Sequence, residues 1–156
     1  MANFIYNEAK RAIAEGEIDF GTGGATIKAM LVMTNTTTNT EDDANTLSAF
    51  TTLDEMDGAN YARITLSSQV VNEDAANNRA EFDAADITWT ALGAGTRQVK
   101  ALIVYKHVGA DSSNVPIAYV DTGGFPFSAN GGNVTIQWNA EGSRPCPRTQ
   151  IGRAHV

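Results

Sequence analysis

The chain has 156 residues, of which 18 are acidic and 11 are Lys or Arg, and its formal net charge is −7. A phosphate backbone is bound by clustered basic residues, so this acidic balance excludes nucleic acid from the expected partners. No apolar run approaches the roughly 20 residues that span a bilayer, and the first residues lack the basic start and apolar core of a signal peptide. We therefore expect no membrane partner and synthesis in a cytoplasm.

The first predicted element is a short helix over Asn3–Gly16. Asn3 is a residue type that caps helix N-termini, and Gly16 is typical of the position that follows a helix. Between them, apolar residues recur at helical spacing: Ile5, Ala9, Ala12 and Ile13. The apolar stripe is thin and partly alanine, so we expect this helix to pack against a sheet.

After Gly16 the apolar residues follow a period of two, which is typical of β-strands. The predicted strand segments are Ala25–Met33, Tyr61–Ser67, Glu81–Leu92, Gln98–Lys106, Pro116–Val120 and Val134–Trp138. In Tyr61–Ser67 we expect Ala62, Ile64 and Leu66 to point inward. Ala25–Met33 and Gln98–Lys106 are apolar on both faces, which favours central strands. Between the strands we predict an exposed loop over Thr34–Asp43, a short helix or turn over Thr46–Leu53, and turns over Asn72–Asn78 and Gly109–Asn114.

This succession predicts a mainly β fold, namely an antiparallel β-sandwich (jelly-roll-like) or barrel with one short N-terminal α-helix. Residues 1–142 are long enough for a single domain with one continuous core. The residues expected in that core are Ile27, Leu31, Ile64, Leu66, Phe82, Trp89, Ile103, Tyr105, Tyr119, Ile136 and Trp138.

Residues 143–156 form a doubtful C-terminal tail. Translated back into DNA, Ile151–Val156 match one frame of a short oligonucleotide adapter that is ligated to DNA fragments before sequencing. We predict that this segment is adapter read-through and that it makes few contacts in the folded domain. The tail holds three of the 11 basic residues, so residues 1–142 carry eight basic against 18 acidic residues and a net charge of −10.

Residues that perform chemistry are sparse. The single cysteine, Cys146, lies in the tail, so we expect neither a disulfide framework nor a cysteine metal site. His107 is the sole histidine of residues 1–142, and without a second histidine or a cysteine it is expected in a solvated turn. No serine lies in a Gly-x-Ser-x-Gly motif, which disfavours a nucleophilic hydrolase.

Eleven of the 18 acidic residues fall between Thr40 and Ile87, which raises two further hypotheses. A polysaccharide-cleaving enzyme needs paired carboxylates, one of them with a raised pKa, whereas these acids lie in polar, turn-like sequence. Glu41–Asp43 and Asp54–Gly58 offer oxygen ligands for calcium, but neither has the spacing of a twelve-residue calcium loop. We therefore expect no enzymatic activity, no metal and no cofactor.

A series of motifs runs through residues 1–142. They are Tyr6-x-x-Ala9-Lys10, Ala14-x-Gly16-x-Ile18-Asp19, Ile27-Lys28-x-x-Leu31-Val32, Gly58-x-x-Tyr61-x-Arg63-x-x-Leu66, Ala80-x-Phe82-x-Ala84-x-Asp86-Ile87-x-Trp89, Leu102-x-Val104-Tyr105-Lys106, Pro116-Ile117-Ala118-Tyr119-Val120-Asp121 and Gly132-x-Val134-Thr135-Ile136-Gln137-Trp138-x-Ala140-x-Gly142. Together they resemble a family of small virion structural proteins of tailed bacteriophages, whose members are labelled head decoration, head fibre, minor tail or tail fibre protein.

The resemblance implies a virion protein, assembled in the bacterial host cytoplasm, with capsid or tail subunits as partners and a homo-oligomeric or lattice-bound state. The leading hypothesis is a capsid decoration or head-fibre-base protein. The alternative is a tail or tail-fibre component that binds a receptor or carbohydrate, for which exposed loop aromatics are expected. Phe125 and Phe127 are the best candidates, although core packing is the favoured explanation for both.

The N-terminal segment is the candidate docking element. Its weakly apolar face, made of Phe4, Ile5, Ala9 and Ile13, is one that a partner subunit can complete. The competing interpretation is that this face covers the domain's own sheet.

Overall fold

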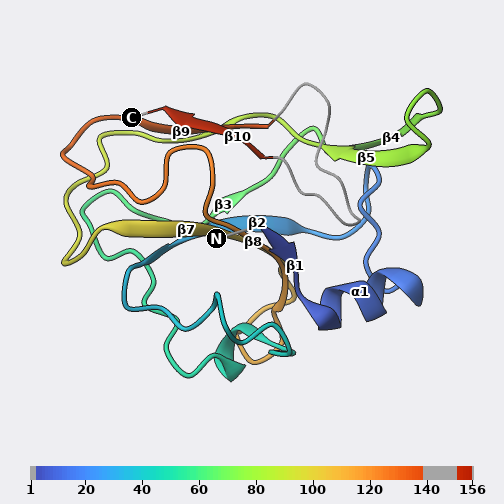
Figure 1. Ribbon diagram of the computed structural model, residues 1–156, viewed down its shortest axis with the longest axis horizontal. Helices are drawn as coiled ribbons and strands as arrows, with labels where there is room; N and C mark the ends of the chain where they lie inside the picture. The colour runs from blue at the N-terminus through green and yellow to red at the C-terminus, as the bar shows by residue number, and fades with distance from the viewer. Residues whose placement is uncertain (1–2, 139–150, 156) are drawn as a thin grey trace.

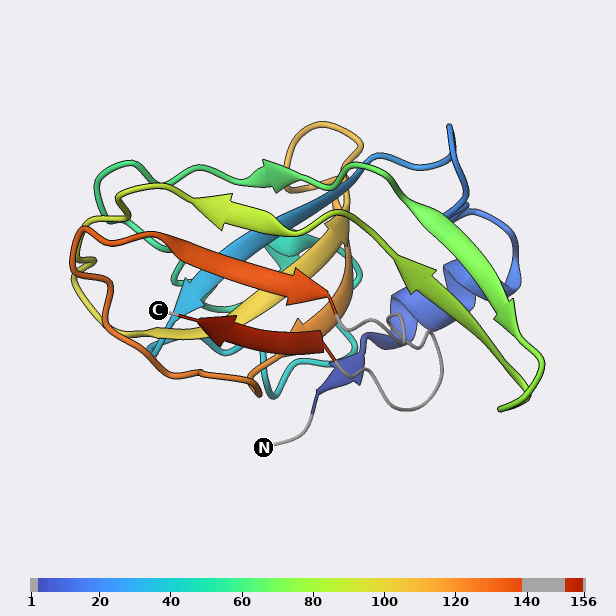
Figure 2. The same cartoon turned by 90° about the horizontal axis from the view of Figure 1, so that it is seen from above.

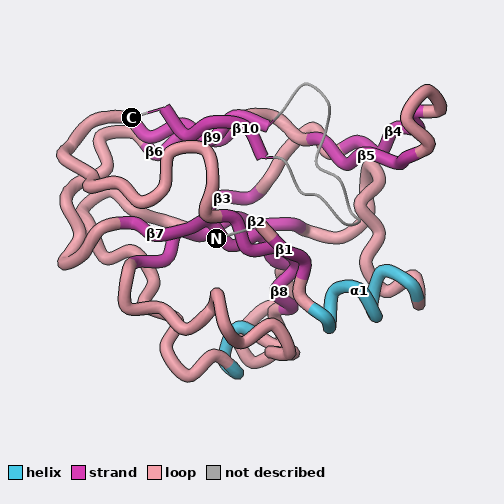
Figure 3. The backbone as a smooth tube through the Cα atoms, in the orientation of Figure 1, coloured by secondary structure: helices cyan, strands magenta, loops and turns pink. Residues whose placement is uncertain are grey.

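The computed structural model describes residues 3–138 and the backbone of residues 151–155. Within these residues it has one α-helix, α1 (Asn7–Ala14), and one short 3-10 helix, η1 (Leu47–Ala49) (Figure 3). The strands are β1 (Phe4–Ile5), β2 (Ile27–Met33), β3 (Ile64–Thr65), β4 (Val70–Asp74), β5 (Arg79–Asp83), β6 (Ile87–Trp89), β7 (Val99–Lys106), β8 (Val115–Val120), β9 (Val134–Trp138) and β10 (Ile151–His155).

The strands build a sandwich of antiparallel sheets. A five-stranded sheet, in the order β1-β8-β7-β2-β3, lies in the middle of the molecule, and a three-stranded sheet, β10-β9-β6, covers one of its faces (Figure 1). The loops that carry η1 lie on the opposite side, and the β4–β5 hairpin extends beyond both sheets (Figures 1 and 2). The predicted mainly β sandwich with one short helix is confirmed, and no closed barrel forms in the described residues.

The pairing of β2 with β7 forms the centre of the fold. The two strands run antiparallel from Ile27 opposite Lys106 to Met33 opposite Val99. Side chains on both faces are buried, because the three-stranded sheet covers one face and the η1 loops cover the other. Each aliphatic side chain buried in this way contributes about 1.5 to 3 kcal/mol. The two segments predicted to be central are therefore central.

Both tryptophans lie in the three-stranded sheet. Trp89 of β6 and Trp138 of β9 are buried, and their indole N–H groups donate to the carbonyl oxygens of Ala62 at 2.7 Å and Ala85 at 2.9 Å. The other residues expected in the core are buried as well, except Ile64, which is partly buried. Ile64 differs because β3 is an edge strand that pairs with β2 over only two residues.

The predicted start of the N-terminal helix is wrong. The helix begins at Asn7, and Phe4 and Ile5 instead form β1, which pairs with the outer edge of β8. Asn3 does not cap the helix, since its side chain bonds to residues that follow β8, including the backbone N–H of Asp121 at 3.1 Å. In the extended conformation β1 pairs with β8 and Ile5 is buried in the core, which a helical start at Asn3 would not provide. The predicted helix end is correct, because Gly16 follows α1 with a φ of +75°.

Two further segments differ from the sequence prediction. The loop over Thr34–Asp43 is not uniformly exposed, because Thr36 and Thr38 are buried and the Thr36 hydroxyl contacts the carbonyl of Leu53 at 2.9 Å. The turn predicted over Asn72–Asn78 is limited to residues 75–78, since β4 continues to Asp74.

The inward position predicted for Ala62 is also wrong. Ala62 is exposed, and only its carbonyl is used, as the acceptor for Trp89. Over Thr46–Leu53, where a short helix or a turn was expected, the structure forms the 3-10 helix η1.

The end of the chain differs from the expectation of few contacts. Residues 151–155 form β10, which pairs with β9, with Ile151 opposite Trp138 and His155 opposite Thr135. The physical reason is that β9 pairs with β6 along one edge only, so its other edge accepts a strand. Residues 139–150, which include Cys146, and residue 156 lie outside the described residues. The adapter origin of the segment stays a prediction.

The fold makes a strong prediction at Gly58. A methyl group added there would overlap the carbonyl oxygen of Gly93, and this backbone is fixed because the Gly93 N–H donates to the Ala59 carbonyl at 2.8 Å. Gly58→Ala should lower the free energy of unfolding by about 1 to 3 kcal/mol, measured by urea denaturation. The control is Gly109→Ala, where the added methyl meets nothing within 4 Å and a change within about 0.5 kcal/mol is expected. Equal losses in both variants would contradict the close approach.

Candidate functional site

The predicted docking residues pack on the domain itself. Ile5 and Ala9 are buried, and Phe4 and Ile13 are partly buried against the core. The Phe4 ring stacks on Tyr119 of β8 with ring centroids 5.3 Å apart. This burial supports the interpretation that the N-terminal segment covers its own sheet, and it leaves little apolar surface for a partner.

His107 is not a fully solvated residue. It directly follows β7 and is half-buried, its ring lies edge-on to Tyr105 at 6.4 Å, and its Nδ1 atom is buried without a hydrogen-bond partner. Among the described residues, no group of three or more His, Cys, Asp or Glu side chains is placed to hold a metal ion.

The acidic runs considered for calcium are engaged by protein donors. Glu41 accepts from the Thr51 backbone N–H at 2.9 Å and from the Thr37 hydroxyl at 2.7 Å. Hydrogen bonding by the Thr51 side chain, and then by Thr37 and the Thr51 backbone, lowers its pKa. Asp57 accepts from the backbone N–H and the hydroxyl of Thr96, both at 2.8 Å, and its pKa is lowered for the same reason. These carboxylates act as caps that hold loops in place.

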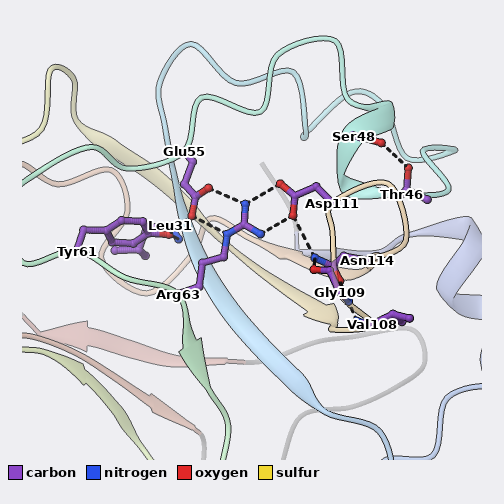
Figure 4. A network of polar contacts seen from close by, with 10 residues as sticks. All are labelled: Leu31, Thr46, Ser48, Glu55, Tyr61, Arg63, Val108, Gly109, Asp111 and Asn114. Atoms are coloured by element: carbon purple, nitrogen blue, oxygen red, sulfur yellow. Dashed lines mark hydrogen bonds and ion pairs between the residues drawn. The ribbon is translucent and has the colours of Figure 1, made fainter.

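A partly buried polar site of the described residues is centred on Arg63 (Figure 4). Its guanidinium forms two bonds to Glu55, at 2.8 and 2.7 Å, and two to Asp111, at 2.5 and 2.8 Å. The same guanidinium lies over the Tyr105 ring, 5.5 Å from its centroid. We call Arg63, Glu55 and Asp111 the Arg63 clamp, because it joins the loop after β2 to the loop after β7.

Two polar residues extend the clamp, the partly buried Tyr61 and the buried Asn114. Tyr61 donates its hydroxyl proton to Glu55 at 2.8 Å and accepts from the Leu31 N–H of β2 at 3.1 Å. Asn114, which is fully buried, donates to Asp111 at 3.1 Å and accepts from the backbone N–H of Val108 at 2.8 Å. The clamp is thereby tied to the central strand β2 and to the β7–β8 connection (Figure 4).

The electrostatics of the clamp do not match those of a glycosidase. Hydrogen bonds from Arg63 hold the pKa of Asp111 below its ordinary value. A general acid needs the opposite, a carboxyl whose pKa is raised by an apolar setting. Burial raises the pKa of Tyr61, and the neighbouring Glu55 adds to this. The site is therefore suited to holding loops together.

The β4–β5 hairpin is the second notable feature. Its register runs from Val70 opposite Asp83 to Asp74 opposite Arg79. Val70 and Val71 of β4 are 37% and 47% exposed. Among the described residues, Val108 is the other large hydrophobic residue with an exposed side chain. Val70 and Val71 are neighbours on β4, so their side chains point to opposite faces of the hairpin, and each leaves apolar surface exposed on an outer strand.

The hairpin is fixed to the body at its second strand. Phe82 of β5 is buried and packs on Phe20, with ring centroids 5.0 Å apart. Across the strands, Arg79 pairs with Asp74 at 2.9 Å, and it also contacts Glu81. The sequence pattern does not indicate this hairpin, because Asn72 and the acidic residues after it favour a turn. The alternation around Phe82 and the Asn77-Asn78 pair were the features that could have located the true turn.

Two shallow grooves lie elsewhere on the described surface. One, of about 430 Å³, is lined by Asn3, Phe4, Ile5, Lys10, Asn39, Thr40 and Asp42. The other, of about 310 Å³, lies between residues 22–26 and 65–69, and its lining contains no titratable side chain. Neither lining contains a histidine or a cysteine.

Comparison with known proteins found no match to the chain among protein-family models, curated proteins or solved structures. Within the described residues, no helix is long and apolar enough to cross a bilayer. The functional argument therefore depends on the chain's own residues.

The Arg63 clamp should stabilise the fold. Arg63→Gln leaves two half-buried carboxylates, those of Glu55 and Asp111, without a positive charge beside them. The free energy of unfolding should fall by about 1 to 3 kcal/mol, which lies between the losses typical of exposed and of buried ion pairs. The control is Arg11→Gln, whose side chain is 44% exposed and whose partners Glu15 and Glu17 are 55% and 50% exposed, so its loss should destabilise the protein much less than that of Arg63. Urea unfolding measures both, and equally small losses would show that the clamp does not stabilise the protein.

The clamp also predicts a pH dependence. The pKa of Asp111 in the folded protein lies below its ordinary value of 3.8. Its ion pair with Arg63 therefore stabilises the protein at any pH above 3.8. This stabilisation is lost as the pH falls through the folded-state pKa. The difference in unfolding free energy between the wild type and Asp111→Asn should be largest near neutral pH and shrink toward about pH 3. Unfolding curves across this range measure it. A difference that does not change with pH would count against the ion pair.

Proposed function

We propose that this chain is a non-enzymatic structural protein of a tailed-phage particle, mounted on the capsid as a decoration or head-fibre-base protein. The observation that carries the proposal is the anchored β4–β5 hairpin, which extends beyond the two sheets and exposes Val70 and Val71. Surface-mounted parts of a lattice need such protruding contacts, because they are held by symmetry-related neighbours. The partners on this proposal are capsid subunits.

The motifs that resemble the phage family support the proposal through their place in the fold. Gly58 makes the close backbone approach to Gly93, Tyr61 and Arg63 belong to the clamp, and Trp89 is buried between the sheets. These residues hold the framework, so a chain that shares the motifs is expected to share the sandwich. The resemblance then supports virion membership, and the choice of capsid depends on the hairpin.

Charge also supports a lattice partner. A chain with a net charge of −7 is attracted to a complementary basic patch, and this attraction acts mainly on the encounter rate and on specificity. Free copies repel one another at long range, which keeps the protein soluble until the shell presents its binding sites.

The tail or tail-fibre alternative gains less support. It requires exposed aromatic side chains for a receptor or carbohydrate, but Phe127 is buried and Phe125 is partly buried against it, with ring centroids 5.5 Å apart. Core packing accounts for both rings.

The test uses the gene's own neighbourhood. Where a major capsid gene lies beside this gene, the two should be co-expressed and the resulting shells separated on a density gradient. We expect the chain to co-sediment with the shells in a fixed ratio, with shells of an unrelated phage as the control. Shells that assemble without retaining the chain would contradict a capsid position, and a gene placed among tail genes whose product co-purifies with tails would favour the alternative.

A further inference from the structure

The turn before β9 contains Asn130-Gly131, the single Asn-Gly pair in the sequence. Both residues are exposed. In such a pair the backbone nitrogen of the glycine can close a succinimide ring on the asparagine side chain, because the chain itself holds the two reacting atoms close together. Glycine has no Cβ that shields this nitrogen. The side-chain amide of Asn130 is therefore open to attack from its own backbone.

The turn polarises the amide that would be attacked. The Oδ1 atom of Asn130 accepts from the backbone N–H of Gly132 at 3.1 Å. A hydrogen bond to this oxygen draws electron density from the amide carbon, Cγ, and makes the carbon a better electrophile. Gly131 lies in the left-handed region with a φ of +89°, which glycine adopts without strain. The Asn130 side chain is thus held beside the backbone that follows it.

A second hydrogen bond of the turn opposes the reaction. The backbone N–H of Gly131 must lose its proton before the nitrogen can attack, and it donates to the Leu92 carbonyl at 2.7 Å. The Leu92 N–H donates back to the Gly132 carbonyl at 2.9 Å. One such bond changes an equilibrium by roughly two- to tenfold, so the folded turn slows the reaction without preventing it. The attacking nitrogen becomes free when residues 130–132 separate from Leu92.

We propose that Asn130 is a site of spontaneous deamidation, at a rate set by opening of this turn. Hydroxide takes the proton of the Gly131 nitrogen, the nitrogen forms a bond to Cγ of Asn130, and the side-chain nitrogen leaves as ammonia. Water then opens the succinimide at either of its two carbonyls, which gives aspartate or isoaspartate. The inference goes beyond the proposed function and does not depend on it, because the chemistry involves this chain and water alone.

The product would alter the turn. Either product adds a negative charge, because a neutral amide becomes a carboxylate. Isoaspartate also inserts a methylene group into the backbone between residues 130 and 131, so the two hydrogen bonds with Leu92 cannot both keep their geometry. Leu92 is buried, and the next residue, Gly93, donates to the Ala59 carbonyl. Deamidation at the surface would therefore loosen a connection that reaches the core.

Peptide mapping tests the site. The full-length protein is incubated at mildly alkaline pH, digested with trypsin and analysed by fragmentation mass spectrometry against an unincubated sample. Asn133 is the internal control, because it is exposed in the same turn but precedes Val134, whose β-branched side chain hinders approach to its backbone nitrogen. Deamidation at Asn130 should exceed that at Asn133 at least about tenfold. No deamidation at Asn130, or equal deamidation at both positions, would overturn the proposal.

Anion-exchange chromatography gives an independent measurement. The added carboxylate should produce a later-eluting species that accumulates in the wild type. Asn130→Gln is the matched variant, since glutamine keeps the amide but has to close a larger ring. The later species should be largely absent from it. Equal accumulation in the variant would contradict the assignment to Asn130.

Unfolding tests the control by the turn. In guanidinium chloride at the same pH, Asn130 should deamidate at least about twofold faster than in the folded protein, because the bond from Gly131 to Leu92 is then absent. Asn133 in the same samples corrects for direct effects of the denaturant. An unchanged or slower rate at Asn130 would overturn the inference that opening of the turn sets the rate.

Discussion

The structure depends on one antiparallel pairing, that of β2 with β7. Both strands are apolar on both faces, so they remain stable only if each face is covered. The three-stranded sheet covers one face, and the loops that carry η1 cover the other. The remaining elements are arranged around this pair. β8 and β1 extend the sheet on one side, β3 extends it on the other, and α1 covers part of β8.

Covering a sheet face with irregular chain creates a second constraint, because loop backbone and side-chain polar groups must find partners when they are buried. The Arg63 clamp, the buried Asn114 and the hydroxyls of Thr36 and Thr38 supply them. This need for partners explains why polar residues are numerous in the loops that cover one face of the five-stranded sheet. It also explains why acidic residues there serve as acceptors for neighbouring loops.

The parts that could be predicted from sequence are those in which local pattern and tertiary role agree. β2 and β7 were identified because their apolar residues on both faces match their central position. Three features could not be predicted, because each is decided by a partner that lies elsewhere in the fold. The start of α1 depends on the pairing of Phe4 with β8, and the burial of the Thr36–Thr38 loop depends on Tyr6, whose hydroxyl donates to Thr38. The extent of β4 depends on its pairing with β5. The Arg63 clamp escaped for the same reason, because Asp111 is 48 residues from Arg63.

Both tryptophans of the chain, Trp89 and Trp138, lie in the three-stranded sheet, and neither lies in the larger one. Their indole groups are buried and bonded to carbonyl oxygens of Ala62 and Ala85. Intrinsic fluorescence therefore monitors one layer of the sandwich, while far-ultraviolet circular dichroism averages over the whole backbone. Tryptophan fluorescence can therefore follow the unfolding of the three-stranded sheet separately from that of the five-stranded sheet.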